Sequence, residues 1–406
     1  MEKNIFVILL LLLFQFSNAQ IVLKGNVSSK NTPLEGAAVY VNNSSIGTST
    51  DSNGNFELTV KSGSYDIVVS YLGFKTISYP LHTSNYKEPL LFILEEDANM
   101  LDEVVIRNTI YDDNWKYNLN QFKTSFIGLS TLAKDCEILN PKVLHFEFDA
   151  RNVKLEAFAK EPLKIKHKSL GYLITYDLVY FRLEKNVVTY LGYTKYEDLK
   201  GGRSKKRKWE KNRLSAYKGS REHFYKSLLD GSTKLEGFIV NQFRRVKNPQ
   251  RPSDDEIRKA RLYLRSKGFR NYSKKISTPK TAIDSSLLII RKSRLSKYVD
   301  YLYKKDIPIN DIISQEGEKH HLTFKDYLSI VYTKEKEDLN YGRSVFSNKK
   351  RTPGPQTSSI VLIKKSPYIE ENSGQIISPL DVFYEGYWAF EKMAETLPLD
   401  YEAPLD

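Results

Sequence analysis

The first part of the sequence is a series of short, β-branched runs between residues 21 and 94. Within most runs apolar and polar side chains alternate, and turn residues such as Gly, Asn and Pro separate one run from the next. The runs follow one another at intervals of roughly ten residues, which is typical of an all-β sandwich. Seven strands are expected, at residues 21–27, 37–41, 47–50, 56–60, 65–71, 74–78 and 90–94. The pattern predicts a β-sandwich domain spanning residues 20–97.

One turn of this domain carries a cluster of polar side chains. Asp51-Ser-Asn-Gly-Asn55 connects two expected strands, and Gly54 can adopt the positive φ that a tight turn requires. Its carboxylate and amide oxygens also suggest calcium, but a hairpin turn is the simpler interpretation.

After residue 114 the pattern changes to a mixture of helical and β periods. Apolar residues recur at helical spacing over 115–134, and Asn140-Pro141 ends that stripe. Residues 209–229 and 253–267 predict further helices, the second beginning with a Ser253–Glu256 capping box. Strands are expected at residues 143–148, 153–159, 170–183, 187–193 and 235–246. We therefore expect a linker at 98–114 and, over 115–406, an α+β domain with a central antiparallel sheet.

The motifs of the first domain resemble the carboxypeptidase-regulatory-like domain, a transthyretin-like β-sandwich. The matching segments are Gly25-Asn-Val27, Pro33-Leu-Glu-Gly-Ala37, Val39-Tyr-Val41, Gly47-Thr-Ser-Thr-Asp-Ser-Asn-Gly-Asn-Phe56, Gly63-Ser-Tyr65 and Tyr71-Leu-Gly-Phe74. The resemblance implies a scaffold and no peptidase activity, because in that family this domain is an accessory to the catalytic one. The whole chain is then a β-rich α+β protein, with a seven-stranded transthyretin-like sandwich followed by the larger domain.

Two later stretches are also similar to known Bacteroidetes proteins. Leu101-Asp-Glu-Val-Val-Ile106 resembles the extended segment that follows this sandwich in outer-membrane receptors, but no series of membrane-spanning amphipathic strands follows here. The rest resembles the C-terminal part of secreted Bacteroidetes proteins of uncharacterised function, which implies no activity. The segments that carry this second resemblance are Trp115, Phe126-Ile-Gly-Leu-Ser130, Cys136-Glu-Ile-Leu-Asn-Pro141, Pro162-Leu163, Leu170-Gly-Tyr172, Trp209-Glu-Lys-Asn-Arg213, Tyr217-Lys-Gly-Ser-Arg-Glu-His-Phe224 and Leu397-Pro-Leu-Asp-Tyr401.

The N-terminus predicts secretion. Lys3 precedes an apolar stretch over residues 5–16, and Ser17-Asn-Ala19 places small residues before a cleavage site at Gln20. This stretch is shorter than the roughly 20 residues that span a bilayer, so residues 1–19 are expected to be a cleaved signal peptide. No transmembrane segment is expected in the mature chain, whose location would be the periplasm or the periphery of the outer membrane.

Charge is distributed unevenly along the chain. The formal net charge is +13, yet residues 1–97 carry a net −3, so everything after Asp97 totals +16. An acidic partner should therefore meet the second domain.

The sequence contains no recognisable catalytic or metal-binding motif. None of the six histidines is followed by Glu at the spacing of a zinc carboxypeptidase, and neither a nucleophile elbow nor a phosphate-binding loop occurs. The single cysteine, Cys136, lies among apolar neighbours at helical spacing and is interpreted as a buried structural thiol. We expect no cofactor, no metal ion and no enzymatic activity.

Tyr217-Lys-Gly-Ser-Arg-Glu-His-Phe224 gathers several functional side chains within a turn or two of helix. Arg213, Arg221 and His223 could surround an anion, with Ser220 or Tyr217 donating a hydrogen bond. The alternative is a helix N-terminus that Ser220 caps, and we favour it because serine caps are common.

The strongest concentration of charge is residues 203–213. Secretion argues against a nucleic-acid partner, whereas anionic lipid headgroups, an acidic glycan or an envelope protein fit the compartment. The alternative is a solvated loop after Gly201-Gly202. Its basic residues, which are candidates for an anion- or partner-binding site, are Arg203, Lys205, Lys206, Arg207, Lys208, Lys211 and Arg213.

Three functional hypotheses follow. The favoured one is a non-catalytic binding or assembly protein of the cell envelope, in which the sandwich is a docking module and the basic domain contacts an anionic surface or a protein. The alternative is a hydrolase of unrecognised type with its site near His223, which requires a pocket joining His223 to a carboxylate and a hydroxyl. Carbohydrate binding by the sandwich would require Tyr40, Tyr65 and Tyr71 to be exposed on one face, and these are equally good core residues.

Overall fold

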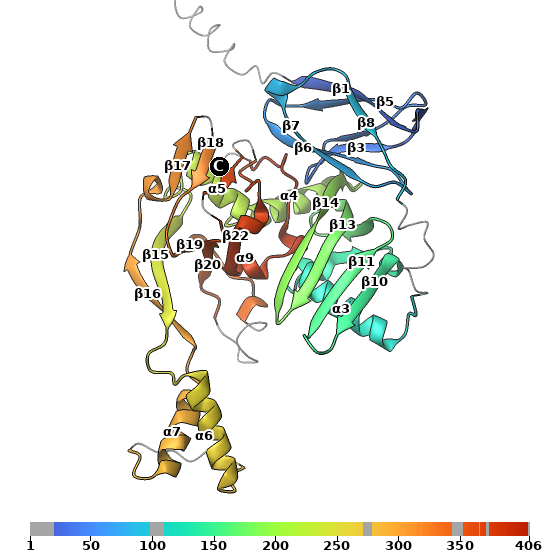
Figure 1. Cartoon of the computed structure of the whole chain (residues 1–406). Coiled ribbons are helices and arrows are strands. Elements are labelled where there is room, and N and C mark those ends of the chain that lie inside the picture. Colours follow the sequence, from blue (N-terminus) through green and yellow to red (C-terminus); the bar gives the residue numbers. More distant parts are fainter. Residues whose placement is uncertain are drawn as a thin grey trace, which may run out of the picture.

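The computed structural model describes residues 20–97, 109–270, 278–317, 319–342, 352–364, 366–370 and 373–404. The expected signal peptide at 1–19 and most of the expected linker at 98–114 lie outside the described residues. Figure 1 shows a β-sandwich next to a larger α+β region in which antiparallel sheets dominate, which confirms the predicted fold class.

The N-terminal domain is a sandwich of two four-stranded sheets. One sheet consists of β1 (Ile21–Ser29), β2 (Thr32–Pro33), β5 (Asn55–Val60) and β8 (Leu90–Ile93). The other has the order β4 (Gly47–Ser49), β3 (Ala38–Val41), β6 (Ser64–Ser70) and β7 (Ile77–His82). Alternate residues of these strands point inward and form one apolar core that includes Leu23, Val39, Phe56, Ile67 and Phe92. The strand beyond the seven expected is the two-residue β2.

The Asp51–Asn55 turn has the predicted conformation. Gly54 has φ +77°, and a Cβ atom there would lie 2.4 Å from the carbonyl oxygen of Val27. One carboxylate oxygen of Asp51 accepts hydrogen bonds from the backbone N–H groups of Asn53 and Asn55. The aspartate is therefore used by the turn itself, as in an Asx turn.

A six-stranded antiparallel sheet begins the second region. Its strands pair in the order β10, β11, β13, β12 and β9, and β14 pairs with the other edge of β13. The strands are β9 (Cys136–Ile138), β10 (Leu144–Asp149), β11 (Lys154–Ala159), β12 (Leu163–His167), β13 (Tyr172–Glu184) and β14 (Val187–Asp198). Helix α3 (Asp113–Phe126) buries Phe122 and Phe126 against this sheet, with ring centroids 4.7 Å from Phe181 and 4.9 Å from Tyr176.

Two local predictions for this region were wrong. The helix expected over 115–134 ends at Phe126, because Gly128 takes φ +109° and a 3₁₀ turn (Leu132–Asp135) follows. Cys136, expected at helical spacing, instead begins the edge strand β9 opposite His167.

The single central sheet expected for the second region is accompanied by another large sheet. Its order is β16 (Tyr298–Lys304), β15 (Phe238–Lys247), β19 (Tyr327–Lys336), β20 (Pro355–Leu362) and β22 (Val382–Gly386). Helices α5 (Arg221–Leu229) and α9 (Tyr387–Phe390) pack on it through Phe224, Tyr225 and Trp388. A small sheet of β17 (Ile313–Glu316), β18 (Lys319–Leu322) and β21 (Tyr368–Ile369) adjoins this core.

A helical hairpin extends from the end of β15 and β16. Helices α6 (Asp254–Ser266) and α7 (Ala282–Lys292) bury their apolar faces against one another and have a small core of their own. Figure 1 shows the pair standing away from the rest of the molecule. The capping box predicted at Ser253 is present, with Glu256 as its second member.

The sandwich packs on the end of β14 through the segment between β3 and β4. Asn43 N–H donates to the carbonyl of Thr194 at 2.7 Å, and Tyr196 N–H donates to the carbonyl of Ser44 at 2.9 Å. The C-terminal segment joins this contact, since Leu399 N–H donates to the carbonyl of Asn43 and Ser45 donates to the carboxylate of Asp400. This end of the sandwich is thus occupied by its own chain.

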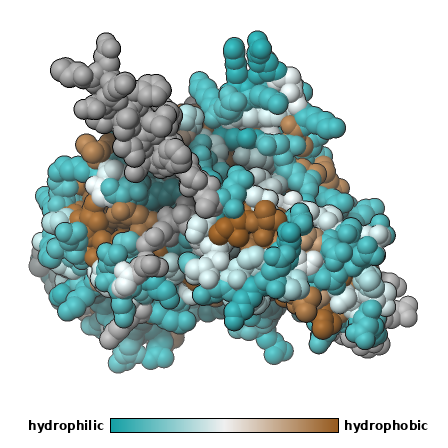
Figure 2. Space-filling model, turned by 90° about the horizontal axis from the view of Figure 1, so that it is seen from above, coloured by the Kyte–Doolittle hydropathy of each residue, from teal (hydrophilic) through white to brown (hydrophobic). Residues whose placement is uncertain are grey.

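Across the described ranges, none of the helices combines the length and the apolar character that crossing a membrane requires. The face shown in Figure 2 is mostly hydrophilic, with separate apolar groups between the polar side chains.

Candidate functional site

The basic stretch forms a helix and not the solvated loop considered from the sequence. Helix α4 (Arg203–Tyr217) starts after Gly202, and the single helix expected over 209–229 is divided into α4 and α5 at Gly219, which has φ +82°. Trp209 anchors α4: its indole N–H donates to the carbonyl of Lys168 at 2.9 Å, and its ring lies over Gly171. A Cβ atom at Gly171 would approach that ring to 2.2 Å, so this contact requires glycine.

The exposed cations of α4 include a stripe on the face opposite Trp209. Arg203, Arg207 and Lys211 follow one another at every fourth position, which places them in one stripe along the helix. None of the exposed basic residues of α4 forms an ion pair within the described part of the chain. These exposed residues are Arg203, Lys205, Lys206, Arg207, Lys208 and Lys211.

Arg213 lies apart from this stripe and serves the fold. Its Nε donates to the carbonyl of Leu170 at 2.8 Å, and its terminal nitrogen lies 2.7 Å from the carboxylate of Asp198. Its guanidinium also stacks 3.8 Å above the ring centre of Tyr172. The structure therefore separates Arg213 from the other cations of its segment.

His223 is packed inside and both of its ring nitrogens are engaged. Nδ1 accepts a hydrogen bond from Gly219 N–H at 3.0 Å, and Nε2 lies 3.1 Å from the carboxylate of Glu236. Burial lowers the pKa of His223, and the hydrogen bond to Glu236 opposes part of that effect. With 4 % of its surface exposed, His223 orients the start of α5, and its ring does not face a hydroxyl nucleophile.

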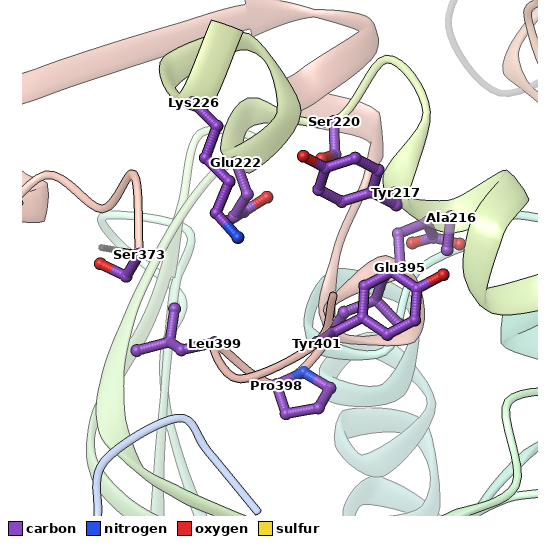
Figure 3. Close-up of a pocket in the computed structure, with 11 residues that line it drawn as sticks. Ala216, Tyr217, Ser220, Glu222, Lys226, Ser373, Glu395, Pro398, Leu399 and Tyr401 are labelled. Atoms are coloured by element: carbon purple, nitrogen blue, oxygen red, sulfur yellow. The ribbon is translucent and has the colours of Figure 1, made fainter. Parts of the chain in front are cut away.

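Ser220 is the N-cap of α5, as favoured from the sequence. Its hydroxyl oxygen accepts the backbone N–H of His223 at 3.1 Å. Ser220 also lines the small pocket of Figure 3, between α4, α5 and the C-terminal segment, with Tyr217, Glu222 and Lys226. The pocket volume is about 20 Å³, close to the space of one water molecule. This pocket is far smaller than a substrate-sized site, and His223 is not among the residues that line it.

A much larger cleft adjoins this pocket, and Glu222 and Leu397 line both. It has a volume of about 610 Å³, which falls within the range of roughly 300–1,000 Å³ of small-molecule sites. Strand β14 forms one wall, the segment from β22 to α9 forms another, and Arg221 and Glu222 reach it from the start of α5. Arg221 was predicted as a site residue, but the cleft was not.

The polar side chains of this cleft have perturbed ionisation. Burial raises the pKa of Glu391 well above its usual range, and Glu395 adds to the effect. Burial and the neighbouring Arg221 lower the pKa of Lys392 to about 8. Burial alone would lower the pKa of Arg221, but Glu222, Tyr384 and other neighbours outweigh this effect and raise that pKa. Clustered perturbation of this kind marks candidate binding sites.

Two further predictions concern single residues. Cys136 is partly buried, and burial raises the pKa of its thiol, as a structural role requires. Tyr40 is buried, while Tyr65 and Tyr71 pack against the sandwich core. This placement is that of core residues and does not form an exposed aromatic face for a sugar. Among the described residues no cluster of three or more metal-ligating side chains occurs.

Comparison with known proteins places the sandwich in a family. Residues 23–106 match the family model of the CarboxypepD_reg-like domain. The chain is also similar to the TonB-dependent receptor SusC of Bacteroides thetaiotaomicron, with 39 % identity over 88 residues. That match covers 21 % of this chain and only 8 % of the receptor's length. The N-terminal domain of this protein is therefore a CarboxypepD_reg-like domain, as its strand pattern and turn motifs indicated.

Proposed function

We propose that this protein is a non-catalytic binding protein of the bacterial cell envelope whose α4 face contacts anionic lipid headgroups. The observation that carries the proposal is the exposed, unpaired set of six cations on one rigid helix. Each Lys or Arg near an anionic membrane surface contributes about 1 kcal/mol. The stripe of Arg203, Arg207 and Lys211 would therefore contribute about 3 kcal/mol, and Lys208 beside it about 1 kcal/mol more. The sum is close to the roughly 4 kcal/mol that corresponds to a millimolar dissociation constant.

The sandwich supports the envelope location and supplies a second surface. Its relatives include a TonB-dependent receptor, and the family implies an accessory scaffold. Leu91 and Ile93 point outward from β8 with 71 % and 66 % of their surface exposed. Exposed apolar side chains of this size fit a role of the sandwich as a docking module for an envelope protein.

The lipid contact can be measured with vesicles and the mature chain. We expect the protein to sediment with vesicles containing phosphatidylglycerol at low salt and to be released by high salt, because salt screens exposed charges. A variant with Arg203, Arg207, Lys208 and Lys211 changed to Gln should bind at least tenfold more weakly. The matched control changes Arg258, Lys259, Arg261 and Arg265 of α6 to Gln, which removes the same charge from another exposed helix.

Equal weakening by both variants would mean that only net charge matters and would contradict a role for the α4 face. In cells, salt washes should release the tagged protein from the membrane fraction. A protein already soluble in the periplasmic fraction at low salt would overturn the proposal and favour a soluble partner.

A further inference from the structure

The cleft between β14 and α9 contains a cation, Arg221, whose acidic neighbours act on it without a direct ion pair among the described residues. Within the described part of the chain, Arg221 forms no ion pair and donates no hydrogen bond; it makes a cation–π contact with Tyr384 at 5.1 Å. The residue is partly buried and lines the cleft. The guanidinium is partly withdrawn from water and donates to none of the described residues, so an anion that enters the cleft would gain a strong partner.

Other donors lie along the same cleft. Lys392 and Tyr190 both line it, and their side chains make no hydrogen bond to any described residue. Glu391 is adjacent to Lys392, and its side chain makes no hydrogen bond to any described residue either. Arg221 acts electrostatically on Glu391, Lys392 and Tyr190, which places all three side chains in its neighbourhood.

One part of the cleft is an apolar wall. Phe383, Leu380 and Ile363 are 39 %, 55 % and 62 % exposed, so the apolar wall continues to the surface. The side chains that form this wall include Val188, Leu191, Ile363, Ile376, Leu380 and Phe383. A ligand of this site should therefore combine an anionic end with an apolar body.

A carboxylate suits the charged end better than a phosphate. The planar fork of one guanidinium matches a carboxylate in a two-point contact. A dianion would also face the carboxyl groups of Glu222, Glu391 and Glu395, which lie near Arg221 and Lys392. We propose that this cleft binds an amphiphilic carboxylate, with Arg221 holding the carboxylate and the β14 and β22 side chains covering its apolar part.

The test adds decanoate to the mature protein. Binding is measured by titration calorimetry and by the change in tryptophan fluorescence, because Trp388 lines the cleft. We expect one equivalent of decanoate to bind, and decanol and decylamine to bind at least tenfold more weakly. Equal binding of decanol and decanoate would overturn the proposal, because the anion would then be irrelevant. Absence of decanoate binding would overturn it as well.

Variants locate the site. Arg221→Gln should weaken decanoate binding at least tenfold, whereas the α6 variant defined above should leave it unchanged. Lys392→Met removes the second cation and should also weaken binding, which provides a test should Arg221→Gln fail to fold. Unchanged affinity in a folded Arg221→Gln or Lys392→Met variant would contradict the proposed site. These outcomes are independent of vesicle binding by α4.

Discussion

The sandwich and the α+β region differ in what they bury. Among residues 20–97 the buried polar side chains are hydroxyl groups, namely Ser29, Ser44, Thr50 and Thr83, and the core is otherwise aliphatic and aromatic. The α+β region buries His167, His223, Glu337 and Glu370 and in addition places Arg221, Glu391 and Lys392 along a cleft.

We interpret this difference as one between a domain that supports the fold and a region that is proposed to bind a ligand. Apolar burial stabilises a fold without directing it toward a ligand, whereas partly buried charges cost stability unless a partner compensates them. The sandwich therefore has the interior expected of a scaffold, and the charged groups of the α+β region are those that the proposed ligand binding requires. The predictions below test this contrast from its largest effect to its smallest.

The largest effect should come from the sandwich core. Phe56 is 3 % exposed and packs 6.0 Å from Phe92, so Phe56→Ala should destabilise the sandwich by about 3–5 kcal/mol. Hydrogen exchange should increase throughout residues 20–97 while β13 and β19 stay protected. The matched variant Phe126→Ala, in the core of the six-stranded sheet, should expose β13 and leave residues 20–97 protected. Loss of protection in both regions with either variant would show one cooperative unit and break the contrast.

A smaller effect concerns buried charge and depends on pH. Burial raises the pKa of Glu395 from 4.5 to about 7, so the folded state holds this proton more tightly than the unfolded chain. The corresponding stability is fully present below pH 4.5 and is lost as the pH rises toward 7. At about 1.36 kcal/mol per pH unit this amounts to roughly 3 kcal/mol.

Glu395→Gln should therefore reduce the fall in stability between pH 4.5 and pH 7. Urea unfolding at several pH values measures this slope. Some slope should remain, because burial also raises the pKa of Glu335 to about 7. The control Glu57→Gln, at an exposed position of the sandwich, should leave the slope as it is. An unaltered slope in Glu395→Gln would mean that this carboxyl group is ionised throughout.

The sandwich could be predicted well from the sequence because its signals are local. Alternation defines each strand, and the Asp51–Asn55 turn contains its own hydrogen-bond partners. In the second region, β10 and β11 were predicted, but β12 and the short β9 were missed. Those strands are short and become strands only through pairing with β13 and with one another.

The cleft could not be predicted because its parts are distant in sequence. Arg221 and Glu391 are far apart in the sequence, with the strands of the five-stranded and three-stranded sheets between them, and neither belongs to a recognisable motif. The cluster at 217–224 was noticed, but its side chains diverge: His223 turns to Glu236, Ser220 caps α5, and Arg221 reaches the cleft. The basic stretch was detected by composition alone. Its division into an exposed stripe and an inward Arg213 depends on Tyr172 and Asp198, which only the fold brings near.

The smallest effect concerns the contact between the two regions. Asp400 accepts hydrogen bonds from the backbone N–H and the hydroxyl of Ser45, so Asp400→Asn should cost about 1–2 kcal/mol of docking. The backbone bonds between residues 43–44 and β14 should keep the regions together, but the amides of Ser45 and Tyr196 should exchange faster. Glu402→Gln is the control, because its ion pair with Lys61 is exposed and such pairs contribute little. Should Glu402→Gln loosen the contact as much as Asp400→Asn, surface charge in general, and not the hydrogen bonds from Ser45 to Asp400, would hold the sandwich. Charge would then matter at the contact between the two regions as well as in the cleft.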